Sequence, residues 1–217
     1  MPNFKRARSE EQKRERAEEI KAAVDKLFQE HPYHTITWTV IADKLGLTRA
    51  NLYQYFQTKE EIFLELCADK REIYYDALRT AIPKESGYSA EVMAEVWAGI
   101  LNANTDHLHY SDILHTIIET NVSVDRLAVY KRGFYQSTYA ISSWLGEQQG
   151  LSRQDSYDMF ISIHYHAVGI HGILRWNPII AAALEKESIT PPKLDFRENL
   201  KSFIMMNLEH YAKKQQK

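Results

Sequence analysis

The segment 37–56 restricts the fold of this chain more than any other part of the sequence. Two short helices can cross steeply only where a small residue lies between their backbones, and Ala42 is such a residue. The turn between the helices needs a residue that tolerates a positive φ, and Gly46 follows four positions later. Apolar residues stand where they would hold the two helices together and against a preceding helix: Ile41, Leu45, Leu47, Leu52 and Tyr55. This spacing predicts a helix-turn-helix motif.

Helical periodicity continues on both sides of this motif, and no tract shows the alternation of a β-strand. We expect a first helix over 10–29, a helix capped by Thr37 that ends at Leu45, and one capped by Thr48 that runs through Phe56. Thr58-Lys59-Glu60-Glu61 has the form of a capping box and should open a long helix that ends before Pro83. Further helices are expected near 89–105, 110–121, 123–149, 152–176, 179–187 and 195–214. The predicted fold class is all-α.

Composition excludes several classes of protein. A hydrophobic share of 44% and a charged share of 26% over 217 residues are ordinary for a globular protein. The first residues contain no apolar stretch of a secretory signal, and no segment approaches the ~20 apolar residues of a membrane helix, so no membrane partner is expected. The single cysteine, Cys67, excludes an internal disulfide framework. These features predict a cytoplasmic protein.

Charge is unevenly distributed, although the net charge is only −2. Residues 1–60 hold eleven basic and nine acidic side chains, whereas the rest of the chain is acidic. Within residues 1–16 the difference is larger, with six basic and three acidic side chains. A basic end on an acidic chain suggests a local surface for phosphates, and a solvated tail is the alternative reading.

The motif also carries a family resemblance. The pattern Thr37-x-x-x-Ile41-Ala42-x-x-Leu45-Gly46-Leu47-Thr48-x-x-x-Leu52-Tyr53-x-Tyr55-Phe56-x-x-Lys59-Glu60 resembles the DNA-binding domain of the TetR family of transcriptional regulators. The resemblance covers roughly residues 14–74, and its ending, Leu-Tyr-x-Tyr-Phe-x-x-Lys-Glu, is its most specific part. It implies a three-helix DNA-binding domain over 14–74, with the helix-turn-helix at 37–56. A helical ligand-binding and dimerisation domain would follow over 75–217.

The second helix of such a motif enters the major groove with its first residues facing the base edges. Here those residues are Thr48, Arg49, Ala50 and Asn51. Arg49 can donate two hydrogen bonds to guanine, Asn51 can pair with adenine, and Ala50 offers a methyl group to thymine. Each good bidentate pair would contribute ~1–3 kcal/mol of base discrimination.

Phosphate contacts are expected on both sides of this helix. Tyr53 and Tyr55 lie further along, at the depth of the phosphates, and the resemblance implies that Tyr53 and Lys59 contact the DNA backbone, as Tyr55 often does. Packing is an alternative role for Tyr55. The start of the preceding helix would meet the other strand through Thr37, Trp38 and Thr39, although packing is the favoured role for Trp38.

The segment 159–176 is apolar on nearly every side, so it should be covered on every side. One face can pack on its own domain and another on a partner. The resemblance implies that this helix and the last one form a four-helix interface in a homodimer; a buried core helix of a monomer is the alternative. The residues expected at the interface are Ala167, Gly169, Gly172, Phe196, Leu200, Phe203, Ile204 and Leu208.

The resemblance also implies that the middle helices enclose a pocket for a small-molecule effector. Core packing is the alternative for its apolar and aromatic members, and surface charge for its two acids, which could otherwise attract a cation. The candidate lining residues are Trp97, Leu101, Leu108, Ile118, Glu119, Phe134, Tyr135, Tyr157 and Asp158.

No metal site, cofactor or catalytic site is expected. The histidine pairs His107/His109 and His164/His166 are two residues apart, and such residues point to nearly opposite sides of a helix. Asp112, His115 and Glu119 share a helix face, an arrangement that is common by chance. The chain has neither a Gly-x-Ser-x-Gly motif nor a phosphate-binding glycine loop, which argues against an enzyme.

The sequence therefore predicts a transcriptional regulator, in particular a repressor, that binds a palindromic operator as a dimer. A small molecule in the body would shift the two recognition helices out of register with the grooves. The alternative is an architectural protein that uses the same fold on DNA and binds another protein in place of a small molecule.

Overall fold

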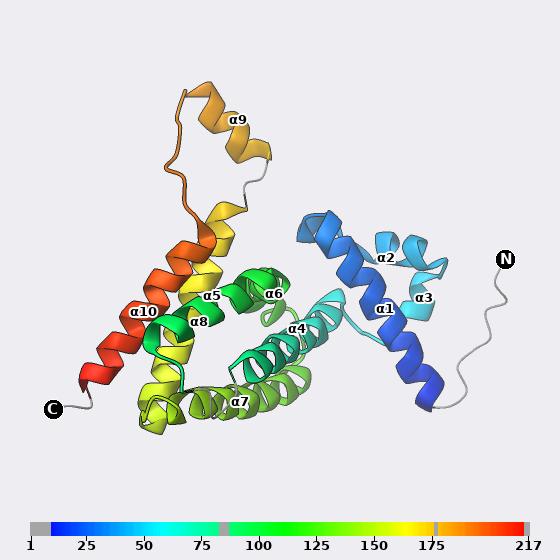
Figure 1. The fold of residues 1–217 in the computed structure, drawn as a ribbon. Coiled ribbons are helices and arrows are strands. Elements are labelled where there is room, and N and C mark those ends of the chain that lie inside the picture. Colours follow the sequence, from blue (N-terminus) through cyan, green and yellow to red (C-terminus); the bar gives the residue numbers. More distant parts are fainter. Residues whose placement is uncertain (1–9, 83–86, 176–177, 215–217) are drawn as a thin grey trace. The chain divides into compact units, whose positions relative to one another are not determined.

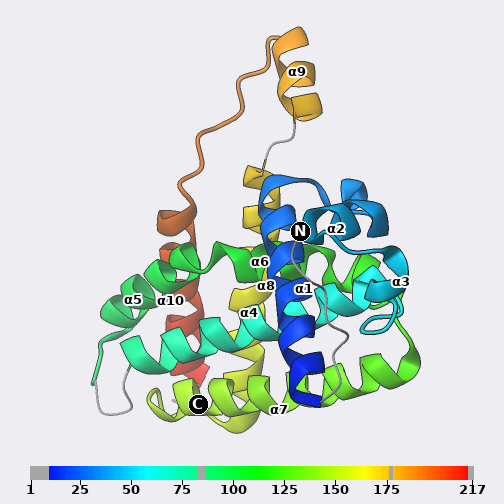
Figure 2. The same ribbon diagram turned by 90° about the vertical axis from the view of Figure 1, so that its right-hand side faces the viewer.

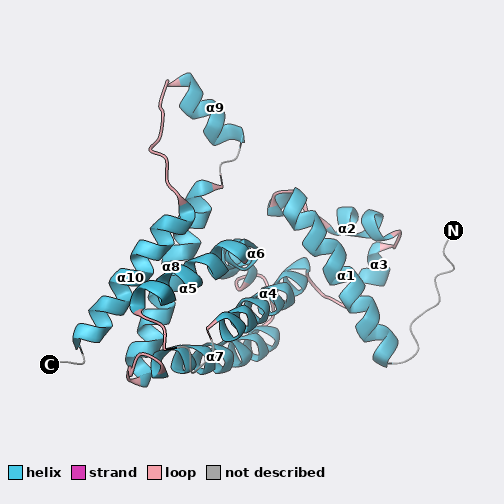
Figure 3. Cartoon of the chain, viewed as in Figure 1, coloured by secondary structure: helices cyan, strands magenta, loops and turns pink. Residues whose placement is uncertain are grey.

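The computed structural model describes residues 10–82, 87–175 and 178–214, and every regular element in these ranges is a helix (Figures 1 and 3). The basic residues 1–9 and the end of the helix expected over 152–176 lie outside them. The chain divides into two compact units. Unit 1 holds the residues through Asp69 together with Leu114–Tyr130, and unit 2 holds Lys70–Ile113 and the residues from Lys131 onward. This division differs from the expected one, since 114–130 groups with the N-terminal residues.

Unit 1 begins with the helices that the sequence predicts. Its N-terminal elements are α1 (Glu10–Glu30), the 3₁₀ turn η1 (Tyr33–Thr35), α2 (Trp38–Leu45), α3 (Arg49–Leu52) and the start of α4 (Lys59–Ala81). Ile20, Ile41 and Leu52 are fully buried, because α1, α2 and α3 each turn an apolar face toward a common core. The ring of Phe28 meets that of Phe63 edge-on, with centroids 5.1 Å apart. This core fixes α2 and α3 against the longer helices.

Helix α3 is shorter than expected. It ends at Leu52, whereas the sequence reading extended it through Phe56. Residues 53–55 form turns, in which the Tyr55 amide donates to the Leu52 carbonyl at 2.9 Å. Phe56, only 2% exposed, packs in the core after this turn. Burial of that ring decides where the helix ends, and helical periodicity alone does not show it.

The second part of unit 1 consists of the π-helical segment η2 (Leu114–Ile118) and the first turns of α7 (Val124–Glu147). Ile118 is fully buried, and the Thr58 hydroxyl donates to the Asn121 carbonyl at 3.3 Å. Arg126 of α7 lies 3.7 Å from the buried carboxylate of Glu61 on α4. These contacts explain why 114–130 groups with the N-terminal helices.

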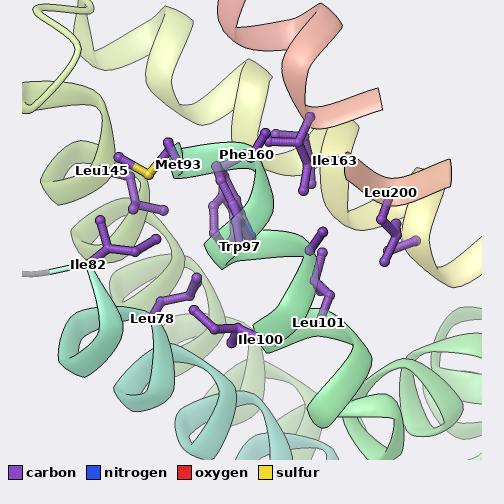
Figure 4. Packing of buried hydrophobic residues seen from close by; sticks show 14 of the residues in the cluster. Leu78, Ile82, Met93, Trp97, Ile100, Leu101, Leu145, Phe160, Ile163 and Leu200 are labelled. Carbon is purple, nitrogen blue, oxygen red and sulfur yellow. The ribbon is translucent and has the colours of Figure 1, made fainter. Parts of the chain in front are cut away.

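Unit 2 contains the remaining turns of α4 and α7 together with α5 (Ala90–Ala103), α6 (Thr105–Ile113), α8 (Arg153–Leu174), α9 (Pro178–Lys186) and α10 (Phe196–Lys214). Helix α10 runs along both α5 and α8 (Figures 1 and 2). Trp97 and Phe160 lie together in the core, with Leu78 of α4, Ile82 directly after α4 and Leu145 of α7 around them (Figure 4). Large apolar side chains from α4, α5, α6, α7, α8 and α10 thus form one continuous core.

The helix expected over 110–121 begins earlier than predicted. Asn104 ends α5, and its side-chain amide donates to the Ile100 carbonyl at 2.8 Å. The next helix starts at once, at Thr105, and passes into η2 at Leu114. A local asparagine cap therefore replaces the longer connection that the sequence suggested.

No single helix in the described ranges is long and apolar enough to cross a membrane. Helices α8 and α9 meet that requirement only when they are counted together, with a bend of 63° between them.

Candidate nucleic-acid interface

Local signals close both ends of α2. The Thr37 hydroxyl accepts a hydrogen bond from the Val40 amide at 3.3 Å, which caps the N-terminus. Gly46 has a φ of 64°, in the left-handed region that favours glycine, and the Leu47 amide donates to the Ala42 carbonyl at 2.9 Å. The chain leaves α2 in a fixed direction and enters α3 two residues later.

A reciprocal cap holds the start of α3. The Asn51 amide donates to the Thr48 hydroxyl at 3.3 Å, and the Thr48 amide donates to Oδ1 of Asn51 at 3.2 Å. Pairing with adenine would need this same oxygen to accept from the base. In the DNA-free protein, Asn51 therefore positions the helix start.

The leading end of α3 faces solvent. Thr48, Arg49 and Ala50 are exposed, as is Thr39 near the start of α2. The core contact of α3 comes from Leu52, which is fully buried. A guanidinium group and a methyl group at an exposed helix start are able to reach base edges in a major groove.

The aromatic residues of the motif differ in their surroundings. Trp38, the first residue of α2, is partly buried and packs against Tyr53, with ring centroids 5.0 Å apart. Tyr53 itself is 47% exposed. Tyr55 is partly buried next to the core residue Phe56. Trp38 thus has the packing contact that the sequence reading favoured.

Lys59 lies in an unexpected environment. Its Nζ donates to the Ile36 carbonyl at 2.7 Å and to the Tyr33 carbonyl at 3.4 Å, and it lies 3.9 Å from the centroid of the Tyr33 ring. Partial burial lowers the pKa of this ammonium group. The side chain expected to bind phosphate therefore also ties the loop before α2 to the start of α4.

The sequence reading missed Tyr33. Its hydroxyl donates to the Glu60 carboxylate, and its ring lies edge-on to Phe63 at 5.1 Å. Burial, followed by the hydrogen bond to Glu60, raises the pKa of Tyr33. An aromatic residue directly after Pro32, in a short connection that also holds the apolar residue Ile36, was the available signal.

The residues expected to line a ligand pocket fall into three groups. Trp97, Leu101 and Leu108 are buried in the core of unit 2. Ile118 and Glu119 belong to unit 1, where the Glu119 carboxylate lies 3.4 Å from Nδ1 of His115. The others lie nearer the surface of α7 and α8, and they are Phe134, Tyr135, Tyr157 and Asp158. Asp158 accepts a hydrogen bond from Gln154 at 2.8 Å.

The expected dimer residues need correction. The side chains of four of them are buried in the core of unit 2, so they do not form a surface that a partner can cover; these are Ala167, Leu200, Ile204 and Leu208. Ala167 is a small residue of α8 and the other three are apolar residues of α10, and this buried stripe faces inward. Phe196 and Phe203 are partly buried against the same core, Gly172 lies beside Asp112, and Gly169 is exposed.

Among the described residues, no three histidine, cysteine or acidic side chains are placed to hold a metal ion together. Asp112, which the sequence places near His115 and Glu119, belongs to unit 2, whereas those two residues belong to unit 1.

An exposed helix start, presented by a capped helix and a glycine turn and followed by an all-helical body, defines a helix-turn-helix DNA-binding regulator. Comparison with protein families agrees. Residues 20–66 match the family "Bacterial regulatory proteins, tetR family", and residues 68–209 match "Tetracyclin repressor-like, C-terminal domain". The chain belongs to the TetR family of bacterial regulators, which act by binding DNA and are not enzymes.

Solved structures share the fold across nearly the whole chain. The fatty acid degradation regulator FadR from Bacillus halodurans is 15% identical, with 94% of this chain and 97% of that chain covered and a TM-score of 0.56. A tetR-family regulatory protein from Rhodococcus RHA1 is 16% identical, with 90% and 96% covered and a TM-score of 0.55. PfmR from Thermus thermophilus is 18% identical, with 88% and 97% covered and a TM-score of 0.52. A search of the curated proteins finds no match.

Proposed function

We propose that this chain is a ligand-responsive repressor that binds a palindromic operator as a homodimer in the bacterial cytoplasm. The observation that carries the proposal is the solvent-exposed leading end of α3, where Arg49 and Ala50 stand clear of the core. A recognition helix needs this geometry to bring side chains to base edges.

In this proposal some residues of the motif contact bases and others contact phosphates. Arg49 reads guanine and Ala50 contacts a thymine methyl group, while Thr48 and Asn51 hold the helix start and are available to the adjacent bases. Tyr53, Tyr55 and Lys59 contact phosphates on one strand. Phosphates of the other strand are contacted from the start of α2, by Thr37 and Thr39, while Trp38 packs against Tyr53.

Dimerisation has a physical reason, because one short recognition helix reads few bases. Two-fold symmetry would place two such helices about 34–36 Å apart, one turn of DNA. Helices α8 and α10 carry exposed apolar side chains in Tyr165, Ile173 and Met206, which are 52%, 69% and 60% exposed. Tyr165, Gly169 and Ile173 follow one another at a spacing of four and so share a face of α8. This outward face supports a homodimer better than the buried stripe does.

Response to a small molecule would follow from unequal affinity of that molecule for the DNA-binding and DNA-free spacings of the dimer. The B. halodurans neighbour is described as a fatty acid degradation regulator. At 15% identity this likeness supports the fold of this chain and does not indicate its effector.

The proposal is tested by selecting bound sequences from a random duplex library and footprinting the protein on the selected sequences. We expect a two-fold symmetric site, and we expect Arg49→Ala to lose ~1–3 kcal/mol of discrimination at one position of each half-site. Lys193→Ala, a change of an exposed basic residue in unit 2, is the control. An asymmetric footprint, or full base preference in Arg49→Ala, would contradict the proposed binding mode.

A further inference from the structure

Four histidines meet between α6 and α8. The rings of His107 and His164 have centroids 5.1 Å apart, and those of His109 and His171 are 6.5 Å apart. His107 and His109 are two residues apart on α6, and His164 and His171 are seven residues apart on α8. The sequence alone does not show that the two pairs meet. Packing of the two helices brings them together in pairs within unit 2.

His107 is the exceptional member of this group. Its side chain is buried, its ring stacks on that of Tyr74 with centroids 5.0 Å apart, and neither ring nitrogen has a hydrogen-bond partner. A neutral imidazole carries one N–H donor and one acceptor nitrogen. Proteins rarely bury such atoms without partners, and an unmatched buried group calls for a missing partner, such as a ligand.

The polar neighbours of His107 are already paired. The Trp97 Nε1 donates to the Tyr74 hydroxyl at 2.8 Å, and the Tyr75 hydroxyl lies 2.9 Å from that of Thr138. The two ring nitrogens of His107, by contrast, have no hydrogen-bond partner.

The side chains that act on His107 indicate the charge of the missing partner. Burial lowers the pKa of His107 most, and the neighbouring His164 and Arg71 lower it further. Arg71 is 5% exposed, lies 5.5 Å from the Phe134 ring centroid and donates to the Glu72 carboxylate. The two side chains that act on His107 are a histidine and an arginine, so an anion suits this position better than a cation.

We propose that His107, together with Arg71 of α4, binds the carboxylate group of a small organic acid, whose apolar body lies among the aromatic side chains around Tyr74. This inference rests on the proposed function, because the acid would be the effector. A bound carboxylate would accept from the imidazole and the guanidinium, and these charge-assisted bonds are the stronger kind. A dianionic phosphate would need more positive charge than one arginine that already shares Glu72.

The site can be tested with full-length protein labelled with ¹⁵N-histidine. The probes are acetate, hexanoate and benzoate, titrated into the millimolar range, with acetamide, hexanamide and benzamide as uncharged counterparts and phenyl phosphate as the alternative anion. The resonances of His107 are assigned by their absence in His107→Phe. We expect at least one carboxylate to shift them saturably, and we expect neither its amide nor phenyl phosphate to do so.

Two substitutions sharpen the result. His107→Phe keeps an aromatic ring on Tyr74 but removes both unmatched nitrogens, so the melting temperature should be equal or higher while carboxylate affinity falls about tenfold or more. Arg71→Gln should weaken the same carboxylate by about tenfold and leave the His107 resonances observable. His210→Phe, at an exposed position on α10, should bind like the wild type.

The proposal is overturned if no carboxylate shifts the His107 resonances, if an amide or phenyl phosphate acts equally, or if His107→Phe binds like the wild type. Operator affinity measured on the same samples separates this failure from failure of the proposed function. Operator binding without any carboxylate effect refutes only the acid site. A carboxylate that shifts His107 in a protein that binds no DNA specifically refutes the proposed regulator and leaves the site standing.

Discussion

The rings of Trp38 and Tyr53 lie 5.0 Å apart, centroid to centroid, at an interplanar angle of 51°. The contact joins the first residue of α2 to the residue that caps the end of α3. Tyr53 is 47% exposed, so its ring is supported on one side while its other atoms remain open to solvent. A tryptophan at this place is therefore best understood as a support for the tyrosine that would meet a phosphate.

Substitutions at these two positions should have different effects. Tyr53→Phe keeps the ring contact and removes the hydroxyl, so DNA affinity should fall by about 0.5–1.5 kcal/mol on operator and random duplexes alike, with unchanged unfolding. Trp38→Ala removes the support and should lower the free energy of unfolding by about 0.5–1.5 kcal/mol beyond the loss of buried area. Fluorescence anisotropy and urea unfolding measure the two effects. A Tyr53→Phe protein that loses affinity for the operator alone would contradict a phosphate contact.

Lys59 should affect both stability and DNA binding. Lys59→Met leaves the Ile36 and Tyr33 carbonyls without their donor, and Ile36 is fully buried, so the free energy of unfolding should fall by about 1–3 kcal/mol. An ammonium group has three donors, and two are used here, so one remains for a phosphate. The slope of log affinity against log salt should therefore decrease by about one.

The matched control for this position is Lys44→Met, which removes an exposed lysine from the last turn of α2. Its free energy of unfolding should equal that of the wild type. If Lys59→Met unfolds at the same urea concentration as Lys44→Met, the carbonyl contacts of Lys59 contribute nothing to stability.

The helices were predictable because their signals are local. Thr37, Thr48 and Ser152 each accept a hydrogen bond from a backbone amide at the start of a helix, and Gly46 takes the left-handed conformation that its position predicted. The end of α3 was not predictable, because it depends on the burial of Phe56, a tertiary contact. Helix capping can be predicted from the neighbouring residues in a sequence, whereas the tertiary contacts of a side chain often cannot.

The same distinction applies to the site. The exposure of Arg49 follows from its place at the start of a short helix, and the sequence predicted it. The carbonyl partners of Lys59 lie more than twenty residues away, so spacing within the motif did not indicate them. The Thr48–Asn51 capping box was visible as a spacing of three, although the asparagine was read as a base contact. His107 was set aside for its spacing on α6, and its significance depends on packing against α4 and α8.

The outward face of α8 should govern dimerisation. Ile173 is 69% exposed in one chain, so Ile173→Asp should leave the fold intact. In the proposed dimer a partner would bury this position, and the new charge should weaken the dimer by about 2 kcal/mol or more. Tyr135→Asp, at a 45% exposed position on α7, is the control and should leave association unchanged. Sedimentation equilibrium measures both. Equal association of Ile173→Asp and wild type would place the interface elsewhere.

The histidines between α6 and α8 should make stability depend on pH. The pKa of His107 is well below its usual 6.5, that of His109 is lowered to about 3, and that of His171 is also lowered, with burial the largest cause in each case. As pH falls below 6.5, the unfolded chain takes up protons that the folded chain does not, so the free energy of unfolding should fall. One fully shifted histidine contributes up to about 1.4 kcal/mol per pH unit.

His107→Phe should remove one such contribution. The ring of His107 stacks on Tyr74 of α4 and lies near His164 of α8, and its pKa is lowered by burial, His164 and Arg71. Urea unfolding between pH 6.5 and about 3 should therefore show a shallower loss of stability in the variant than in the wild type, by up to about 1.4 kcal/mol per pH unit. His210→Phe makes the same substitution at an exposed position on α10 and controls for the added ring. Equal slopes in wild type and His107→Phe would mean that His107 accepts a proton in the folded protein as readily as in the unfolded chain, which burial beside a guanidinium group should prevent.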